Sequence, residues 1–238
     1  MAQGQRVQQV AVLGLGRFGR AVARELARLG HEVLAVDADE RAVEQVAAEV
    51  TQAAQADVTD ERALSGLGLG ACDAAIVALA SSLEASILGT VLCKRLGVPR
   101  VVARAGTALH GAILGQVGAT RVVYPEQETG VRVARSFAAP AVEDYLDVAP
   151  GYGIARVGVT AGLSGSRLAA LALPLAAQAE RLTPIALVRG STVLLNPAPE
   201  ETVREGDALI VAGRDEDLER LPGRTAAPGA RDAPPAPA

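Results

Sequence analysis

The chain has 238 residues, half of them hydrophobic, but only 2% are aromatic and none is Trp. This length suits a medium domain plus a small one, and a core built from Ala, Val and Leu suits helices packed closely on a parallel sheet. A net charge of −4 and a pI near 5.3, with no basic stripe in the sequence, argue against a nucleic-acid partner.

Membrane-spanning and metal-binding patterns are missing from the sequence. Residues 1–9 lack a charged segment followed by an apolar one, and the longest uncharged apolar stretches, 74–83 and 168–177, have about half the length of a membrane span. We therefore expect a soluble, cytoplasmic protein. Cys72 and Cys93 have no metal-ligand spacing, so we expect two buried, reduced thiols.

The first predicted strand, a run of apolar residues, leads into a glycine-rich turn and then a helix. In this pattern, Gly14 allows the tight turn, Gly16 lets a phosphate approach the backbone, and Gly19 lets helix and strand pack closely. Free N–H groups at the start of the helix face an anion. The second strand ends on Asp37, which can accept hydrogen bonds from both ribose hydroxyls and would repel a 2′-phosphate. These features together predict a site for an adenine nucleotide.

Further strand candidates alternate with helices along the first half of the chain. They lie at 32–36, 51–56, 73–79, 100–104 and 120–124. This alternation is typical of a doubly wound parallel sheet, so we predict an α/β, Rossmann-like fold.

The pattern changes after Pro125. One amphipathic helix is predicted over 126–139, ended by Pro140. Short strand-like runs punctuated by Gly and Pro then predict a small α+β domain, with strands at 141–148, 154–159, 184–188, 192–195 and 208–212. We therefore expect a nucleotide-binding domain (7–125), a crossover helix (126–140), a C-terminal domain (141–221) and a disordered tail (222–238).

Residues that catalysis would need are missing from the expected places. The single lysine, Lys94, lies far from any glycine loop, which excludes a Walker-type phosphate loop. The two histidines are His31 in a predicted turn and His110 in a predicted helix, and no His or Lys follows residue 110. A dehydrogenase usually takes its proton donor or acceptor from the second domain. No Gly-x-Ser-x-Gly elbow occurs either. The predicted site binds a nucleotide without transforming it.

Several other polar residues fall at carboxyl ends of strands, where ligands bind in such sheets. Asp57, Val58 and Thr59 follow the third strand and can meet an adenine edge, although capping of the next helix by Thr59 or Asp60 is an equal alternative. Ala78, at the end of the fourth strand, belongs to the same edge.

Two arginines and one acid complete the candidate site. Arg17 in the glycine turn and Arg104 at the end of the fifth strand can neutralise phosphate charge, and the alternative for each is a solvated arginine. Glu126 is an odd residue to face phosphates unless a divalent cation lies between them. The simpler alternative is that its carboxylate complements the helix dipole.

Together these residues make the chain resemble the RCK family, the regulators of potassium conductance that include KtrA-type and TrkA-type cytosolic subunits of bacterial potassium transport. The similarity covers about residues 7–221 and is greatest to the KtrA type. The matching segments are Gly14-Leu15-Gly16-Arg17-Phe18-Gly19, Gly30 to Asp37, Pro125-Glu126 with Gly130-Val131, Asn196 to Glu200, and Arg204-Glu205-Gly206-Asp207. Ala56 stands where many relatives carry Gly.

The resemblance implies a non-enzymatic regulatory subunit. Family members form dimers that assemble into an octameric ring on a membrane potassium-transporting subunit of the KtrB or TrkH type, and ATP/ADP or NAD(H) sets the shape of the ring. The implied roles are phosphate binding by Gly14, Gly16 and Gly19, terminal-phosphate binding by Arg17, ribose binding by Asp37, adenine contacts near Asp57 and Thr59, phosphate binding by Arg104, and binding of a divalent cation, Mg²⁺ or Ca²⁺, by Glu126. Leu15, Phe18 and Val58 belong to the same nucleotide-binding segments.

Some family members also bind cyclic di-AMP in an apolar pocket of the C-terminal domain, which Ile185 and Pro199 would line here. An NAD-dependent oxidoreductase on the same fold and a scaffold with a vestigial site are the competing hypotheses.

Overall fold

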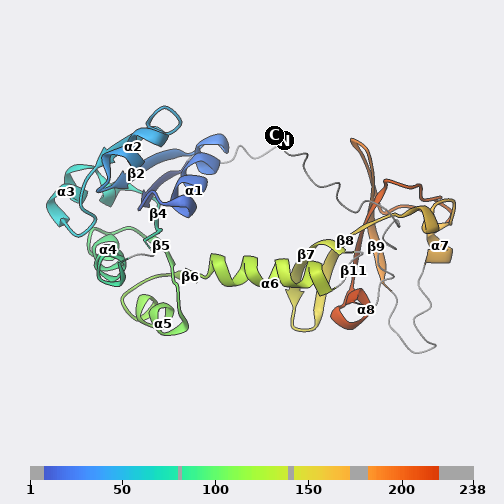
Figure 1. Ribbon diagram of the computed structural model, residues 1–238. Helices are drawn as coiled ribbons and strands as arrows, with labels where there is room; N and C mark the ends of the chain where they lie inside the picture. The colour runs from blue at the N-terminus through green and yellow to red at the C-terminus, as the bar shows by residue number, and fades with distance from the viewer. Residues whose placement is uncertain (1–7, 80–81, 139–141, 172–181, 220–238) are drawn as a thin grey trace, which may run out of the picture. The chain divides into compact units, whose positions relative to one another are not determined.

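The computed structural model describes residues 8–79, 82–138, 142–171 and 182–219. The chain divides into two compact units, Met1–Glu126 and Gln127–Ala238 (Figure 1). The tail predicted over 222–238 lies outside the described residues. In the described parts of the chain, no helix combines the length and the hydrophobicity that crossing a membrane requires.

The first unit contains a six-stranded parallel sheet with the order β3-β2-β1-β4-β5-β6. This order reverses between β1 and β4, and in such sheets ligands bind at that point, beyond the carboxyl ends of the strands. The sheet confirms the predicted Rossmann-like class. Its strands are β1 (Gln9–Leu13), β2 (Glu32–Asp37), β3 (Gln52–Gln55), β4 (Ala74–Val77), β5 (Arg100–Arg104) and β6 (Arg121–Val123).

Helices cover both faces of this sheet and create two hydrophobic cores, because alternate residues of a strand point to opposite faces. In β1, Val12 packs with α1 and α2 residues on one face, whereas Ala11 and Leu13 belong to the larger core on the other face, with residues of α3, α4 and α5. The helices are α1 (Arg17–Arg28), α2 (Glu40–Ala47), α3 (Glu61–Gly66), η1 (Leu69–Ala71), α4 (Leu83–Arg95) and α5 (Ala108–Gln116).

Side-chain caps start most of these helices where the sequence places them. Asp39 accepts a hydrogen bond from the amide of Arg41 at the start of α2, Asp60 accepts from two amides of α3, and Ser82 accepts from Ala85 at the start of α4. Gly30 has φ +85° just after α1, a left-handed conformation that glycine adopts readily at the end of a helix.

Helix α6 (Pro125–Ala138) continues the chain from β6 (Figure 1). It begins at Pro125, one residue before the predicted start, because proline fits the first helical turn, where its missing N–H needs no partner. Its apolar residues Val131, Val133 and Phe137 are 42%, 50% and 82% exposed.

The second unit is built on a five-stranded antiparallel sheet with the order β10-β9-β11-β8-β7, which confirms the predicted α+β class. One face buries a core that includes Tyr145, Leu187 and Leu218. The elements are β7 (Val142–Ala149), β8 (Tyr152–Gly158), η2 (Ala161–Leu163), α7 (Leu168–Leu171), β9 (Thr183–Arg189), β10 (Thr192–Leu195), β11 (Ala208–Arg214) and α8 (Asp215–Glu219).

Both cysteines are buried and reduced, as predicted. Burial raises the pKa of the Cys93 thiol to about 12 and also raises the pKa of Cys72. Because the thiolate is the reactive form, both thiols are poor nucleophiles, and both pack in the hydrophobic core.

Candidate functional site

The three glycines of the turn between β1 and α1 have different structural reasons to be glycine. Gly14 has φ +94°, and a Cβ there would lie 2.7 Å from Cδ2 of Leu79. At Gly19, a Cβ would overlap the carbonyl oxygen of Gly14 and lie 3.2 Å from Cβ of Ala78. Packing of α1 against β1 and β4 therefore requires glycine at positions 14 and 19.

Gly16 is the exception, because no neighbouring atom requires its small size. A Cβ at Gly16 would have no atom of the described residues within 4 Å, and the backbone there (φ −63°, ψ −174°) is open to other residues. Gly16 is also the N-cap of α1, where no side chain caps the helix and the first turn has no acidic residue. The N–H groups of this turn are thus available to an anion, and the helix dipole favours one there.

The turn holds the Asp37 carboxylate in a fixed orientation at the end of β2. One carboxylate oxygen accepts from the amide of Leu15 at 2.5 Å, and the other accepts from the amide of Asp39 at 2.9 Å. An ionised carboxylate has about four lone-pair positions, so two acceptor positions are left for further donors. A diol such as that of a ribose matches this remaining capacity.

Arg104 brings a positive charge to the same turn from the end of β5. Its guanidinium lies 5.7 Å from the ring centroid of Phe18, in the first turn of α1, and the side chain is only 16% exposed. Its Nη2 donates to Oε1 of Glu126. Its Nε is the one buried side-chain nitrogen or oxygen in the described residues that has no hydrogen-bond partner.

Glu126, in the first turn of α6, forms the other half of this ion pair, and its side chain is 64% exposed. Its pKa lies below the usual range, mainly because its own backbone amide donates to the carboxylate, with further contributions from Arg104 and Arg17. Arg17 is exposed at the start of α1, and its positive charge contributes least to this lowering of the pKa.

Asp57 and Thr59 form a small turn just after β3, where the amide of the preceding residue, Ala56, donates to the carbonyl of Asp37 at 3.0 Å. The amide and the hydroxyl of Thr59 both donate to Oδ1 of Asp57 at 2.8 Å, and these bonds lower the pKa of that carboxyl. The helix cap is Asp60, so Asp57 stays exposed at this edge. Val58 and Ala78 are buried, at 5% and 3% exposure, and contribute backbone and packing.

The site supplies few ligands for a cation. No group of three or more His, Cys, Asp or Glu side chains that could hold a metal occurs in the described residues. The predicted metal ligand, Glu126, is paired with Arg104. A divalent cation at Glu126 would need most of its oxygen ligands from phosphate groups and water.

His110 is a residue of α5 and is buried on the side of this helix that contacts α4. The hydrogen bonds of its ring nitrogens are structural. Its Nδ1 accepts from the amide of Gly106, so its Nε2 carries the proton and donates to Oγ of Ser86 at 3.0 Å. Burial lowers the pKa of His110. This histidine is therefore neutral and acts as a structural bridge between the two helices.

The second unit has a separate cavity of about 480 Å³ between the start of β9 and the 196–199 loop. Pro199 lines this cavity. Ile185 is 37% exposed next to the lining residue Pro184, and its carbonyl accepts a hydrogen bond from the amide of Asn196. The other lining residues are Leu168, Ala169, Leu182, Thr183, Asn196, Pro197 and Ala198.

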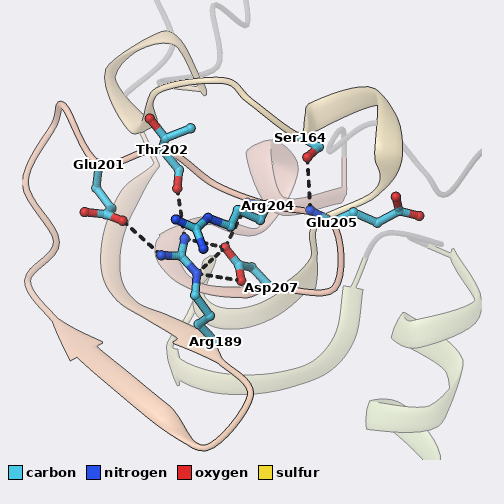
Figure 2. Close-up of polar contacts among 7 residues, drawn as sticks. All are labelled: Ser164, Arg189, Glu201, Thr202, Arg204, Glu205 and Asp207. Carbon is cyan, nitrogen blue, oxygen red and sulfur yellow. Dashed lines mark hydrogen bonds and ion pairs between the residues drawn. The ribbon is translucent and has the colours of Figure 1, made fainter.

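A charged network fixes the chain that follows this loop (Figure 2). Arg189, at the end of β9, donates to both oxygens of Asp207 and to the carbonyl of Thr202, and pairs with Glu201. Asp207 is buried and also accepts from the amide of Arg204 at 2.8 Å. Arg189 holds the pKa of Asp207 below its usual range. The Arg204-Glu205-Gly206-Asp207 motif thus has a structural role.

The structure brings most of the predicted site residues to one edge of the sheet. In the turn between β1 and α1, Leu15 donates to Asp37, Gly14 and Gly19 pack next to Ala78, and Phe18 lies against Arg104. Sequence reasoning missed the Asp39 amide on Asp37 and the partner of Asp207, Arg189. The Asp39 amide is a backbone group, which the sequence does not distinguish from any other. Arg189 is one of 22 arginines, and no neighbouring residue pattern indicates that it pairs with Asp207.

Comparison with known proteins identifies one family domain in this chain and several relatives that it matches over nearly their full length. The TrkA-N domain matches residues 10–125. The Ktr system potassium uptake protein A of Bacillus subtilis (strain 168) is 36% identical over 215 residues, which cover 90% of this chain and 95% of that protein.

Solved structures share the fold at lower identity. The GsuK RCK domain aligns with a TM-score of 0.62 at 18% identity, over 93% of this chain and 48% of that one. A GsuK channel bound to NAD aligns with a TM-score of 0.58 at 18% identity, over 92% of this chain and 39% of that one. This chain thus spans less than half the length of either GsuK chain.

Proposed function

Because this chain belongs to the family of Ktr potassium uptake proteins, with a TrkA-N domain in an RCK-like fold, we propose that it is a nucleotide-sensing regulatory subunit of a potassium uptake system. Its relative from Bacillus subtilis is similar over nearly its full length, so both units of the chain have counterparts in that protein. The subunit acts on a membrane potassium-transporting partner of the KtrB or TrkH type, at the cytoplasmic face, as a ring of dimers.

The main support for nucleotide binding is that an open, uncapped helix N-terminus lies next to a carboxylate of fixed orientation. Gly16 leaves space at the first turn of α1, and the amide of Leu15 fixes Asp37 beside it. Phosphates suit the first group and a ribose suits the second. Arg104 adds positive charge and an unpartnered Nε on the phosphate side.

We infer that ATP and ADP are the ligands, with NAD(H) as the alternative, since a GsuK channel of the same fold is bound to NAD. Asp37 accepts from the ribose, the α1 turn and Arg104 bind phosphates, and Arg17 reaches a terminal phosphate. Asp57, Val58 and Thr59 follow Ala56, whose amide donates to the carbonyl of Asp37, so we expect the adenine ring to contact them beyond the ribose. Glu126 shares a Mg²⁺ or Ca²⁺ ion with the phosphates, and such an ion would neutralise part of their charge.

The protein changes shape on binding and performs no reaction. A ligand shifts a conformational equilibrium only by its difference in affinity for the two states. ATP and ADP differ by a terminal phosphate, which is the group that Arg17 and Glu126 with a cation would recognise. We therefore expect ATP to favour the transport-active state.

The oxidoreductase hypothesis is not favoured. The sequence has no His or Lys after residue 110, and His110 is buried and bonded to Ser86. A further proposed ligand is cyclic di-AMP in the second unit, at the cavity lined by Pro199 beside Ile185.

Titration calorimetry with ATP, ADP, NADH and cyclic di-AMP, with and without Mg²⁺, tests this function. We expect ATP to bind more tightly than ADP in Mg²⁺. Asp37→Ala should abolish binding, while Glu32→Gln, at the opposite end of the same strand, should preserve it. Equal affinities for ATP and ADP, together with one particle shape in small-angle scattering, would refute the sensor. Turnover of NADH with small carbonyl compounds would support the alternative.

A further inference from the structure

Arg104 makes only part of the hydrogen bonds that its geometry allows. A guanidinium presents its N–H groups as a rigid fork, which suits two oxygens of one phosphate or carboxylate. Here, Nη2 donates to one oxygen of Glu126, while Nε is buried without a partner. The pair with Glu126 is therefore monodentate and leaves a buried donor unsatisfied, which is costly.

Arg104 is also held by packing that does not involve Glu126. The guanidinium lies over the Phe18 ring at 5.7 Å, in the same first turn of α1 whose amides have no side-chain cap. Its side chain is 16% exposed, whereas Glu126 is 64% exposed. If one partner leaves this pair, it is Glu126, because water can solvate its carboxylate at little cost.

We propose that Glu126 is an internal competitor for the phosphate site: it holds Arg104 in the free protein, and a nucleoside di- or triphosphate must take Arg104 from it. This inference rests on the proposed function. A phosphate can accept from both Nε and Nη2, which satisfies the donor that Glu126 leaves unpaired. The exchange therefore favours ligands with phosphates over adenosine, which has none.

The competition connects the phosphate site to helix α6. Glu126 is in the first turn of α6, and further along the same helix Arg132 pairs with Asp144 of β7 at 3.8 Å. Loss of the Arg104 contact frees the first turn of α6 from β5. The same step frees the Glu126 carboxylate for a divalent cation, so its role as a competitor precedes its role as a cation ligand.

The experiment is titration calorimetry of the full chain with ADP and adenosine in EDTA, where no divalent cation is present. Glu126→Gln removes the competing charge and should bind ADP about three- to tenfold more tightly than the unmodified chain, since exposed ion pairs and nearby like charges have effects of this size. Adenosine affinity should not change. Glu128→Gln, with the same charge change on the same helix, should bind ADP as the unmodified chain does.

Arg104→Gln supplies the second half of the test. Glutamine removes the charge that Glu126 holds, so Glu126→Gln should give little or no further gain in ADP affinity in an Arg104→Gln background. Hydrogen exchange in residues 125–131 should speed up on ADP binding in the unmodified chain, and should already be fast in Glu126→Gln.

The two proposals fail in different ways. If Glu126→Gln binds ADP no more tightly in EDTA, or if its gain persists with Arg104→Gln, the competitor role is wrong while nucleotide sensing stands. If neither the unmodified chain nor any variant binds ATP or ADP under any condition, the proposed function itself is wrong.

Discussion

Substituting the three glycines of the β1–α1 turn with alanine, one at a time, should separate folding from binding. Gly14→Ala places a Cβ 2.7 Å from Leu79 at a φ of +94°. Left-handed backbone costs an alanine about 1–2 kcal/mol and overpacking costs about 1–3 kcal/mol, so we expect a loss of about 2–5 kcal/mol of stability. Gly19→Ala overlaps a carbonyl oxygen of the backbone. Its cost, after a gain of about 1 kcal/mol in helix propensity, should be about 2 kcal/mol or more.

Gly16→Ala should behave in the opposite way. Its Cβ meets no atom of the described residues, and its backbone conformation is allowed for alanine. Loss of unfolded-state entropy gains about 0.4–1 kcal/mol, and alanine is poorer than glycine at an N-cap by a similar amount, so stability should change by less than about 1 kcal/mol. ADP affinity should fall at least about tenfold, because the Cβ occupies the space through which a phosphate approaches the amides of α1.

Differential scanning calorimetry and titration calorimetry on the same preparations measure both effects. Calorimetry suits a chain of two units because each unit can melt separately. The second unit should melt unchanged in all three variants. The reasoning is refuted if Gly16→Ala loses as much stability as the other two, or if it binds ADP as tightly as the unmodified chain.

Three further predictions concern titratable groups. Arg189 lowers the pKa of Asp207 in the folded state. The ion pair therefore stabilises the second unit above the unfolded pKa of about 3.9, and this stabilisation is lost as the pH falls through the folded pKa. Thermal melts at acidic pH should show this loss of stability in the unmodified chain but not in Asp207→Asn. Burial lowers the pKa of His110 in the folded state, so the first unit should begin to lose stability as the pH falls below about 6.5. His110→Gln should remove that loss, which thermal melts between pH 7.5 and 5 can measure. With a pKa of about 12, Cys93 should resist iodoacetamide at pH 8 and react once urea unfolds the chain; rapid labelling of the folded protein, read by mass spectrometry, would contradict this.

Local sequence patterns predicted the elements of this fold well, because the causes of those elements are local. β10 was predicted at its observed bounds, and the glycines at 14 and 30 have the positive φ values that a tight turn and a helix end require. The order of the second sheet could not be predicted in the same way. β11 lies between β9 and β8, a pairing that joins residues far apart in the chain, and no short pattern encodes it.

The candidate site shows the same division. Asp37 was identified from its distance to the glycine turn, but its two backbone donors follow from the folded turn. The sequence placed Arg104 at the end of the fifth strand and Glu126 at the start of the crossover helix, and suggested a role for each with a ligand. Their contact with each other, across 22 residues, depends on how the first turn of α6 lies beside β5, which residue spacing does not specify.

The two ends of the site differ in how complete they are before a ligand binds, and this difference suits a sensor. Asp37 is already oriented by two amides, so the ribose end gains little further order from binding. The phosphate end contains an uncapped helix turn, an arginine with an unsatisfied Nε, and an acid held by that arginine. Only contacts that change between two states can shift an equilibrium. We therefore expect the number of phosphates, and not the base or the sugar, to determine any change at α6.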